Sequence, residues 1–242
     1  MQPAVTVVLT KFKRLDTFAE QERACVNQTW PISEILVCDN THYNLGPWAR
    51  FATALMAKTE WIWILDDDIL PGKNWLKLAM EANLGGQLAL RGPSGTYLPL
   101  QHELPRINPQ GDQNWVEIGA AKMHTDEEVT ENTQVDFVIQ GYLLKREWLL
   151  WFWEKEFTDK SERFYAEDQW LAYQCAKRGI PAIVQGWQTD IPGTRGTNTA
   201  FSNMGVTDQK GLWATGSLEY RNKYAKHWQS LIAKGWQPIK HG

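Results

Sequence analysis

The sequence predicts an α/β fold in which a mostly parallel sheet is flanked by helices. Three short apolar runs, at 5–10, 35–38 and 61–65, are typical of buried strands. Helical patterns at 15–27 and 48–58 separate these runs. Strand, helix, strand, helix, strand with short connections favours parallel strands covered by helices, which is a Rossmann-like arrangement.

The rest of the chain is less regular, and we expect it to belong to the same single domain, 1–242. Residues 93–134 and 188–217 are rich in loop-forming residues, so we expect mobile loops there, followed by a C-terminal helix and tail at 218–242. The further elements that the patterns predict are helices at 73–83, 145–153, 167–179 and 218–233, strands at 88–91, 135–139 and 182–184, and hairpin strands near 96–98 and 115–118.

Composition argues against several classes of protein. The formal net charge of -3 does not suit a general nucleic-acid footprint, and no run of about 18 apolar residues indicates a membrane span. The start of the chain lacks the basic flank and apolar stretch of a secretory signal. Cys25, Cys38 and Cys175 form no CxxC pair, so we expect reduced, buried thiols in a cytoplasmic protein. The 14 tryptophans suit core positions or stacking on sugar rings.

Polar residues follow each of the first three predicted strands. Thr10, Asp39 and the run from Asp66 to Asp68 stand at these positions. Ligands of open α/β sheets bind beyond the carboxyl ends of the strands, so these residues are expected to meet in one crevice.

The three consecutive aspartates repel one another unless a cation or solvent compensates them. Hard oxygen ligands suit Mg²⁺ or Mn²⁺, which bind through one or two carboxylates and substrate phosphates. The alternative is a solvated turn that caps the next helix. Because side chains alternate along an extended chain, Asp66 and Asp68 should share a side. We expect Asp68 to bind the metal, Asp66 to contact the ribose or the metal shell, and Asp67 to bond within the protein, for example to Arg50.

A second acidic pair, Glu167 and Asp168, begins a helical pattern. Carboxylates in a first helical turn are favoured by the dipole and by capping, which is one interpretation. The other is catalytic, because a positioned carboxylate can take the proton of an acceptor hydroxyl. Burial beside Phe164, Tyr165 and Trp170 would raise the pKa of such an acid. We expect Asp168 to be this base, with Glu167 in reserve or binding acceptor hydroxyls.

These motifs, in this order, resemble nucleotide-sugar glycosyltransferases of the GT-A fold, most nearly glycosyltransferase family 2. The run from Asp66 to Asp68 resembles the family's DxD motif, and Glu167-Asp168 with Gly179-Ile180 resembles its ED helix. The resemblance covers roughly residues 4–185, and its other matched segments are 5–14, 27–31, 35–40, 49–51 and, on the acceptor side, 141–148.

The resemblance implies transfer from a nucleoside-diphosphate-sugar, with a UDP-sugar as first guess, to a glycan or glycosylated acceptor. It implies that Thr10 and Asp39 contact the nucleoside and that Arg50 lies near the base or phosphates. Asp66 and Asp68 would bind the ribose and Mn²⁺ or Mg²⁺, which would offset charge on the departing diphosphate.

The resemblance also makes Asp168 the base of an inverting displacement, although the aspartate triplet is similar to exostosin-type transferases, which retain configuration. Residues 139–142 depart from the family pattern, and no His-x-His pair occurs near the C-terminus. His227 is either a further metal ligand or an ordinary helix histidine. Arg195 lies in a loop that either closes over the diphosphate or is plain surface.

Two other functions fit parts of the pattern. A carbohydrate-binding module would explain the tryptophans without needing the aspartates. A nucleotidyltransferase would use metal-bound carboxylates, but it ordinarily has a glycine-rich phosphate loop, and residues 9–14 are basic without a glycine.

Overall fold

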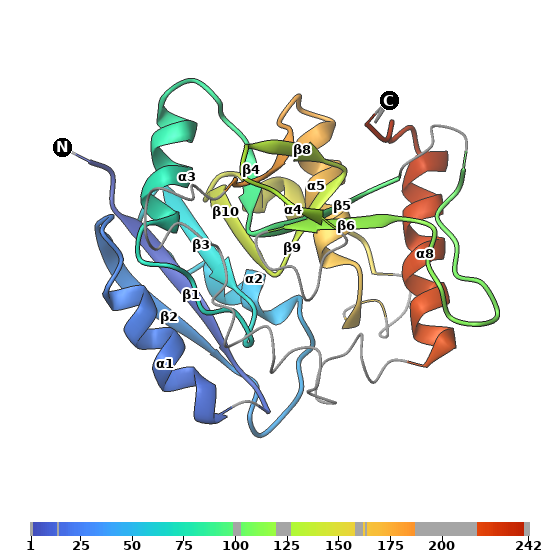
Figure 1. The fold of residues 1–242 in the computed structure, drawn as a ribbon. Coiled ribbons are helices and arrows are strands. Elements are labelled where there is room, and N and C mark those ends of the chain that lie inside the picture. Colours follow the sequence, from blue (N-terminus) through green and yellow to red (C-terminus); the bar gives the residue numbers. More distant parts are fainter. Residues whose placement is uncertain are drawn as a thin grey trace.

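The computed structural model describes residues 2–13, 15–98, 103–119, 127–157, 162, 164–186 and 217–239. Within these ranges a seven-stranded sheet has the order β2-β1-β3-β10-β4-β11-β8, and a four-stranded sheet has the order β7-β6-β5-β9. Figure 1 shows α1 and α3 at one end of the molecule and α8 at the other. The strands are β1 (Val5–Lys11), β2 (Ile32–Asp39), β3 (Trp61–Leu65), β4 (Leu90–Gly92), β5 (Ser94–Tyr97), β6 (Val116–Gly119), β7 (Glu127–Glu128), β8 (Thr133–Val135), β9 (Phe137–Ile139), β10 (Gly141–Lys145) and β11 (Ala182–Val184), and the helices are α1 (Leu15–Val26), α2 (Ala49–Ala54), α3 (Trp75–Leu84), α4 (Trp148–Phe152), α5 (Glu167–Ala176) and α8 (Leu218–Ala233).

The larger sheet contains the parallel strands that the sequence predicts. β1 pairs in parallel with both β2 and β3, and β4 pairs in parallel with β11. β10 runs antiparallel between β3 and β4, and β8 runs antiparallel along β11. The α/β class with a mixed, mostly parallel sheet is therefore confirmed.

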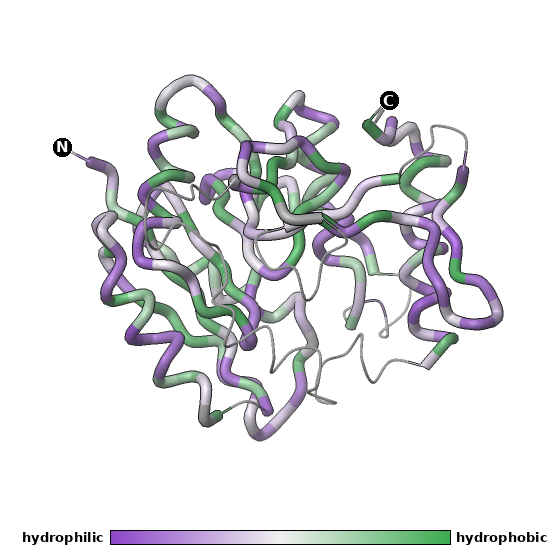
Figure 2. The backbone as a smooth tube through the Cα atoms, viewed as in Figure 1, coloured by the Kyte–Doolittle hydropathy of each residue, from purple (hydrophilic) through white to green (hydrophobic). Residues whose placement is uncertain are grey.

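Both faces of β1 and β3 are buried, which explains why these strands are apolar throughout. Val7, Trp63 and Leu65 pack with Trp75 of α3 in one cluster. Ile64, on the other face, packs in a second cluster that includes residues of α2, α4, α5 and α8. The rings of Trp63 and Trp75 are stacked with centroids 5.1 Å apart. Burying one large apolar side chain stabilises a fold by roughly 1.5–3 kcal/mol. In Figure 2 hydrophobic residues gather along these central strands, whereas α1 also carries hydrophilic ones.

The stretch 93–134 contains strands. β5 and β6 pair antiparallel, which confirms the hairpin strands expected near 96–98 and 115–118. The mobility of this stretch stays a prediction. Residues 188–216 of the second expected loop, and the end of the tail at 240–242, lie outside the described residues.

Within the described residues the chain passes between the two sheets at four points. It leaves the larger sheet at Pro93 and at Asp136, and it returns between β7 and β8 and again at Gln140. The carboxylate of Asp136 accepts hydrogen bonds from the backbone N–H groups of Leu98, at 3.0 Å, and Ile239, at 2.8 Å. These bonds tie the C-terminal tail to the junction of the sheets.

Several elements differ from the sequence expectation. The strand predicted at 135–139 is divided between β8 of the larger sheet and β9 of the smaller one. Residues 141–145 form strand β10 rather than the approach to a helix, because four of its five positions are buried between β3 and β4. Helix α2 ends at Ala54 and not near 58, because Leu55 and Met56 are exposed turn residues rather than buried helical ones.

The last helix, α8, has the predicted bounds and a side-chain cap. The Ser217 hydroxyl accepts a hydrogen bond from the backbone N–H of Tyr220 at 3.3 Å, which satisfies one of the free N–H groups of the first turn. No helix in the described ranges is long and apolar enough to cross a membrane.

The three cysteines are free and buried, as the sequence predicts. Cys25 lies in α1, Cys38 in β2 and Cys175 in α5. Burial raises the pKa of the Cys25 and Cys175 thiols to about 12 and also raises the pKa of Cys38. A thiol with so high a pKa carries almost no thiolate at neutral pH.

Candidate active site

The predicted polar residues of the first two strands lie at one edge of the larger sheet with the acidic run after β3. Thr10 of β1 is paired with Cys38 of β2, which precedes Asp39. Leu9 of β1 is paired with Leu65 of β3, which precedes Asp66. The Thr10 hydroxyl is buried and has no hydrogen-bond partner within the described residues. Asp39 is exposed, and its carboxylate accepts two bonds from Thr41, which lower its pKa. The three strand ends therefore lie side by side, and a shared crevice between them stays a prediction.

Arg50 joins the two acidic segments. Its Nη1 pairs with Oδ1 of Asp66, and its Nη2 lies 2.6 Å from Oε1 of Glu167. Nη2 also donates to the phenol oxygen of Tyr142 in β10, at 3.2 Å. The carboxylate of the acidic run that Arg50 binds is thus Asp66, and not Asp67 as the sequence suggested. Because the guanidinium is engaged on two sides by carboxylates, it is a link within the protein rather than a free phosphate ligand.

Asp168 is the neighbour of Glu167 in the first turn of α5, and donors hold both of its oxygens. Oδ1 accepts from the backbone N–H of Gln169 at 2.7 Å, and Oδ2 accepts from the phenol of Tyr224 at 2.6 Å. Glu167 and Asp168 are only 7% and 8% exposed, so neither is an ordinary solvated capping acid. The helix start thus brings both acids into a largely buried polar cluster.

Burial is the main influence on these two carboxyl groups. It raises the pKa of Glu167, and the charge of Arg50 only partly opposes it. Burial and the nearby Glu167 raise the pKa of Asp168 to about 8, while the bonds from Tyr224 and Gln169 act in the opposite direction. An acid near neutral pKa is suited to taking up and releasing a proton, which is the property of a general base.

Two strained backbone positions flank the acids. Ala166, immediately before α5, is left-handed with φ 60° and ψ 25°. Gln140, with φ 69°, precedes β10, and its carbonyl accepts from the backbone N–H of Asp66 at 3.1 Å. Such conformations cost roughly 1–3 kcal/mol for residues other than glycine and tend to occur at functional sites.

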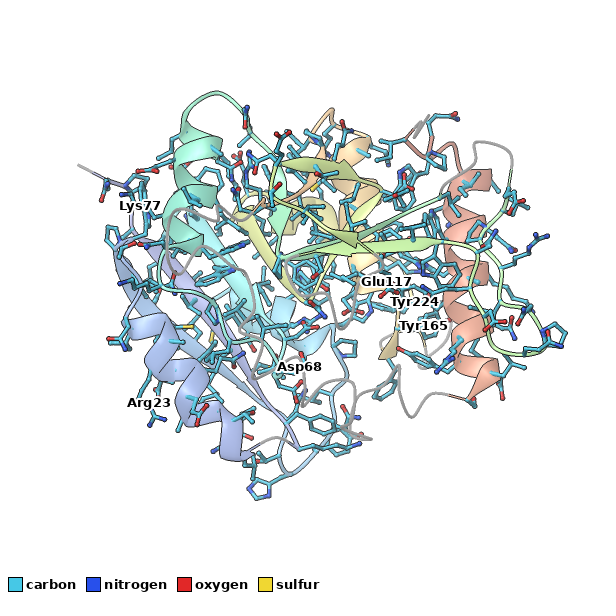
Figure 3. The ribbon with its side chains drawn as sticks, in the orientation of Figure 1. Arg23, Asp68, Lys77, Glu117, Tyr165 and Tyr224 are labelled. Atoms are coloured by element: carbon cyan, nitrogen blue, oxygen red, sulfur yellow. The ribbon has the colours of Figure 1, made fainter. Side chains whose placement is uncertain are left out.

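The acidic run suits a metal that is shared with a substrate, not one enclosed by protein. The described residues contain no group of three or more His, Cys, Asp or Glu side chains arranged to hold an ion. Asp66 is committed to Arg50, and the side chains of Asp66 and Asp68 are partly exposed. Mg²⁺ commonly binds through one or two carboxylates, with phosphate oxygens and water completing its shell, and this donor set fits that mode. Figure 3 shows Asp68 at the end of β3, with Tyr165 and Tyr224 across from it toward α8.

The sequence offered two further candidate site residues, His227 and Arg195. His227 lies on α8 with Nδ1 2.9 Å from Oε1 of Gln169, and burial lowers its pKa to about 4. Its ring is therefore neutral near pH 7 and engaged with α5, and its role as a metal ligand stays a prediction. Arg195 lies outside the described residues.

Sequence reasoning missed Tyr142 and Tyr224. Tyr142 lies in the unpredicted strand β10, so its position beside Arg50 had no sequence signal. Tyr224 shares the inward stripe of α8 with Trp228 and Leu231, a spacing that indicates a buried helix face. That spacing does not indicate which element the face contacts.

One hollow of the described residues lies away from this edge. A hollow of about 630 Å³ is lined by residues around the amino end of β2, including Gln28 and Glu34, at the opposite end of the parallel strands from Asp39. It therefore has no part in the acidic cluster. No protein-family model matches this sequence, and no curated protein matches it significantly.

Proposed function

We propose that the protein is a metal-dependent glycosyltransferase of the GT-A type, which moves a sugar from a nucleoside-diphosphate-sugar to an acceptor hydroxyl. One observation carries the proposal: acids from two distant segments, Asp66 and Glu167-Asp168, meet through Arg50 at the carboxyl edge of the sheet. In open α/β sheets, ligands bind in crevices at this edge. The acids then serve the two needs of glycosyl transfer, which are compensation of diphosphate charge and removal of a proton.

The reaction needs a base that is ionised before transfer and protonated after it. The acceptor oxygen forms its bond to the anomeric carbon while its proton passes to the Asp168 carboxylate. The bond between that carbon and the diphosphate oxygen breaks, and its electron pair leaves with the nucleoside diphosphate. The inverting outcome follows from this single displacement, and the raised pKa of Asp168 supports the base role.

The donor side would be formed by the ends of the first three strands. Asp68, with Asp66 beside it, would hold Mn²⁺ or Mg²⁺, whose chemistry when bound is to offset charge on the diphosphate. The Thr10 hydroxyl, which has no hydrogen-bond partner among the described residues, and the exposed carboxylate of Asp39 are suitable contacts for the nucleoside. Arg50 would hold Asp66 and Glu167 in place, and its position near the base or phosphates stays a prediction.

A panel of nucleoside diphosphates and their sugars, each with and without Mn²⁺, tests the proposal by thermal shift. We expect one nucleotide, UDP first, to raise the melting temperature only when Mn²⁺ is present. Incubation of that sugar nucleotide with glycan acceptors should release the free nucleoside diphosphate. No shift with any nucleotide, in either condition, contradicts the proposal.

The same experiment separates the two rival functions. Release of pyrophosphate instead of nucleoside diphosphate indicates a nucleotidyltransferase. Glycan binding that survives the double change Asp66→Ala and Asp68→Ala, without any nucleotide-dependent shift, indicates a carbohydrate-binding module.

A further inference from the structure

Helix α8 docks onto the first turn of α5 through polar contacts. The phenol of Tyr224 donates to Oδ2 of Asp168 at 2.6 Å. Nε2 of Gln169 donates to the backbone carbonyl of Tyr224 at 3.3 Å, and Oε1 of Gln169 lies 2.9 Å from Nδ1 of His227. Two successive residues of α5 thus face one turn of α8. This helix lies outside the segment that resembles known transferases.

The Tyr224 phenol is itself held in place. Its ring centroid is 6.2 Å from that of Phe137 in β9 and 6.4 Å from that of Trp115, the residue before β6. Both rings support the Tyr224 ring. The next inward residue of α8, Trp228, packs edge-on against Phe137 at 4.7 Å. A rigid aromatic stem with one fixed donor can restrain a carboxylate more tightly than a flexible side chain can.

The two donors fix the plane of the Asp168 carboxylate. The Gln169 N–H occupies one lone-pair direction of Oδ1, and the Tyr224 O–H occupies one of Oδ2. Each oxygen of an ionised carboxylate has a second lone pair. The carboxylate is therefore held in one orientation and still has acceptor capacity for a substrate proton.

We propose that Tyr224 is a positioning residue, whose hydrogen bond to Oδ2 holds Asp168 in the orientation and ionised state that a general base needs. The inference rests on the proposed function, because it assigns α8 a part in the same site. Tyr224 does not touch the reacting atoms in this scheme; it acts through Asp168.

The charges around Asp168 make one hydrogen bond from Tyr224 significant. The ionised form of Asp168 is opposed by burial and by Glu167, and it is favoured by Tyr224, Gln169 and Arg50. Removal of a donor that bonds the ionised form raises the pKa of an acid. The groups that face Asp168 are Glu167 of its own helix, Arg50 of α2, Tyr142 of β10, and Tyr220 and Tyr224 of α8.

The test is Tyr224→Phe, which removes the donor and keeps the ring. A hydrogen bond to a charged group is typically worth enough to lower kcat roughly ten- to hundredfold, with the donor KM unchanged. The acidic limb of the pH–rate profile should move to higher pH. The matched control is Tyr173→Phe, because this phenol of α5 bonds the backbone carbonyl of Lys234 and not an acid; it should leave both kcat and the pH profile unchanged.

A second variant guards against misfolding of Tyr224→Phe. Replacing Tyr224 with 3-fluorotyrosine keeps the shape and makes the phenol a stronger donor, so the acidic limb should move to lower pH. An unmoved limb in both variants, or equal effects in the Tyr173→Phe control, overturns the proposal.

A readout that needs no turnover separates this proposal from the proposed function. Titration of ¹³C-labelled aspartate carboxyls by NMR, with Asp168→Asn to assign the signal, reports the pKa of Asp168 directly. A higher pKa in Tyr224→Phe with no transfer from any sugar nucleotide supports the positioning role and contradicts the glycosyltransferase. An unchanged pKa of Asp168 in Tyr224→Phe, in a protein that does transfer sugar, contradicts the positioning role and supports the glycosyltransferase.

Discussion

Nη2 of Arg50 lies 2.6 Å from Oε1 of Glu167, and the two side chains are only 7% and 9% exposed. The same guanidinium pairs with Asp66 at the end of β3. A single buried cation thus neutralises acids from the donor and acceptor sides of the proposed site. A change at Arg50 is therefore expected to affect both the fold and the geometry of the two acidic segments.

Arg50→Met should strongly destabilise the fold. Loss of one partner from a buried ion pair leaves an uncompensated charge and typically costs about 3–5 kcal/mol. Urea unfolding measures the loss. Lys77→Met is the matched control, because Lys77 and Glu81 form an exposed pair on α3, 47% and 49% exposed, whose removal should cost less than about 1 kcal/mol. Adding Glu167→Gln to Arg50→Met should restore part of the stability, and the idea of a buried charge link is wrong if it restores none.

Asp68→Asn should weaken metal-dependent donor binding at least tenfold and leave the fold intact. The side chain is partly exposed, so loss of its charge has little effect on packing. Calorimetric titration of the nucleoside diphosphate with Mn²⁺ should show affinity at least tenfold weaker than in the unmodified protein. Glu81→Gln on α3 makes the same change of charge at an exposed site and should bind normally. Unchanged Mn²⁺-dependent binding in Asp68→Asn would remove this residue from the metal site.

Asp168→Asn should retain donor binding but lose transfer. General-base catalysis typically contributes 10²- to 10⁴-fold, so kcat should fall by about that factor while the donor KM stays the same. Steady-state release of the nucleoside diphosphate measures both constants. In the unmodified enzyme kcat should rise with pH through about 8, the pKa of Asp168, because the base acts in its ionised form. Full activity in Asp168→Asn is incompatible with the base role.

Stability should fall as the pH rises from 7 to 9. The pKa of Asp168 is about 8 in the folded protein and about 3.9 in an unfolded chain, so the folded state holds a proton that the unfolded state has lost. This contribution is complete below the unfolded pKa and is lost as the pH rises through 8. Asp136, with a raised pKa of about 6, and His227, with a lowered pKa of about 4, titrate below this range. The buried thiols also affect stability here, because they ionise at about pH 8.5 only in the unfolded chain, but they are common to both proteins and cancel in the comparison. Urea midpoints should therefore change less between pH 7 and 9 in Asp168→Asn than in the unmodified protein, and equal slopes would contradict this assignment.

The local pattern predicted much of the fold and the identity of the strand-end residues. β3 and α8 have the predicted bounds, because an apolar run and an amphipathic stripe are local signals. The strand β10 was missed because its pairing with β3 and β4 is a long-range property. The same limit applies to the site, since the partner of Arg50 depended on how α2 and α5 meet the end of β3. A sequence pattern places Asp66 and Asp67 side by side, and only tertiary packing determines which one the guanidinium reaches.

The three cysteines provide built-in reporters of partial opening. They are buried in different elements, Cys25 in α1, Cys38 in β2 and Cys175 in α5, so alkylation of each requires a different part of the molecule to separate. Mass spectrometry of pulse-alkylated protein would then compare how readily α1, β2 and α5 open, without any engineered label. Because Cys175 lies on the helix that carries Asp168, protection of its thiol by a bound nucleotide would show ligand binding transmitted along α5.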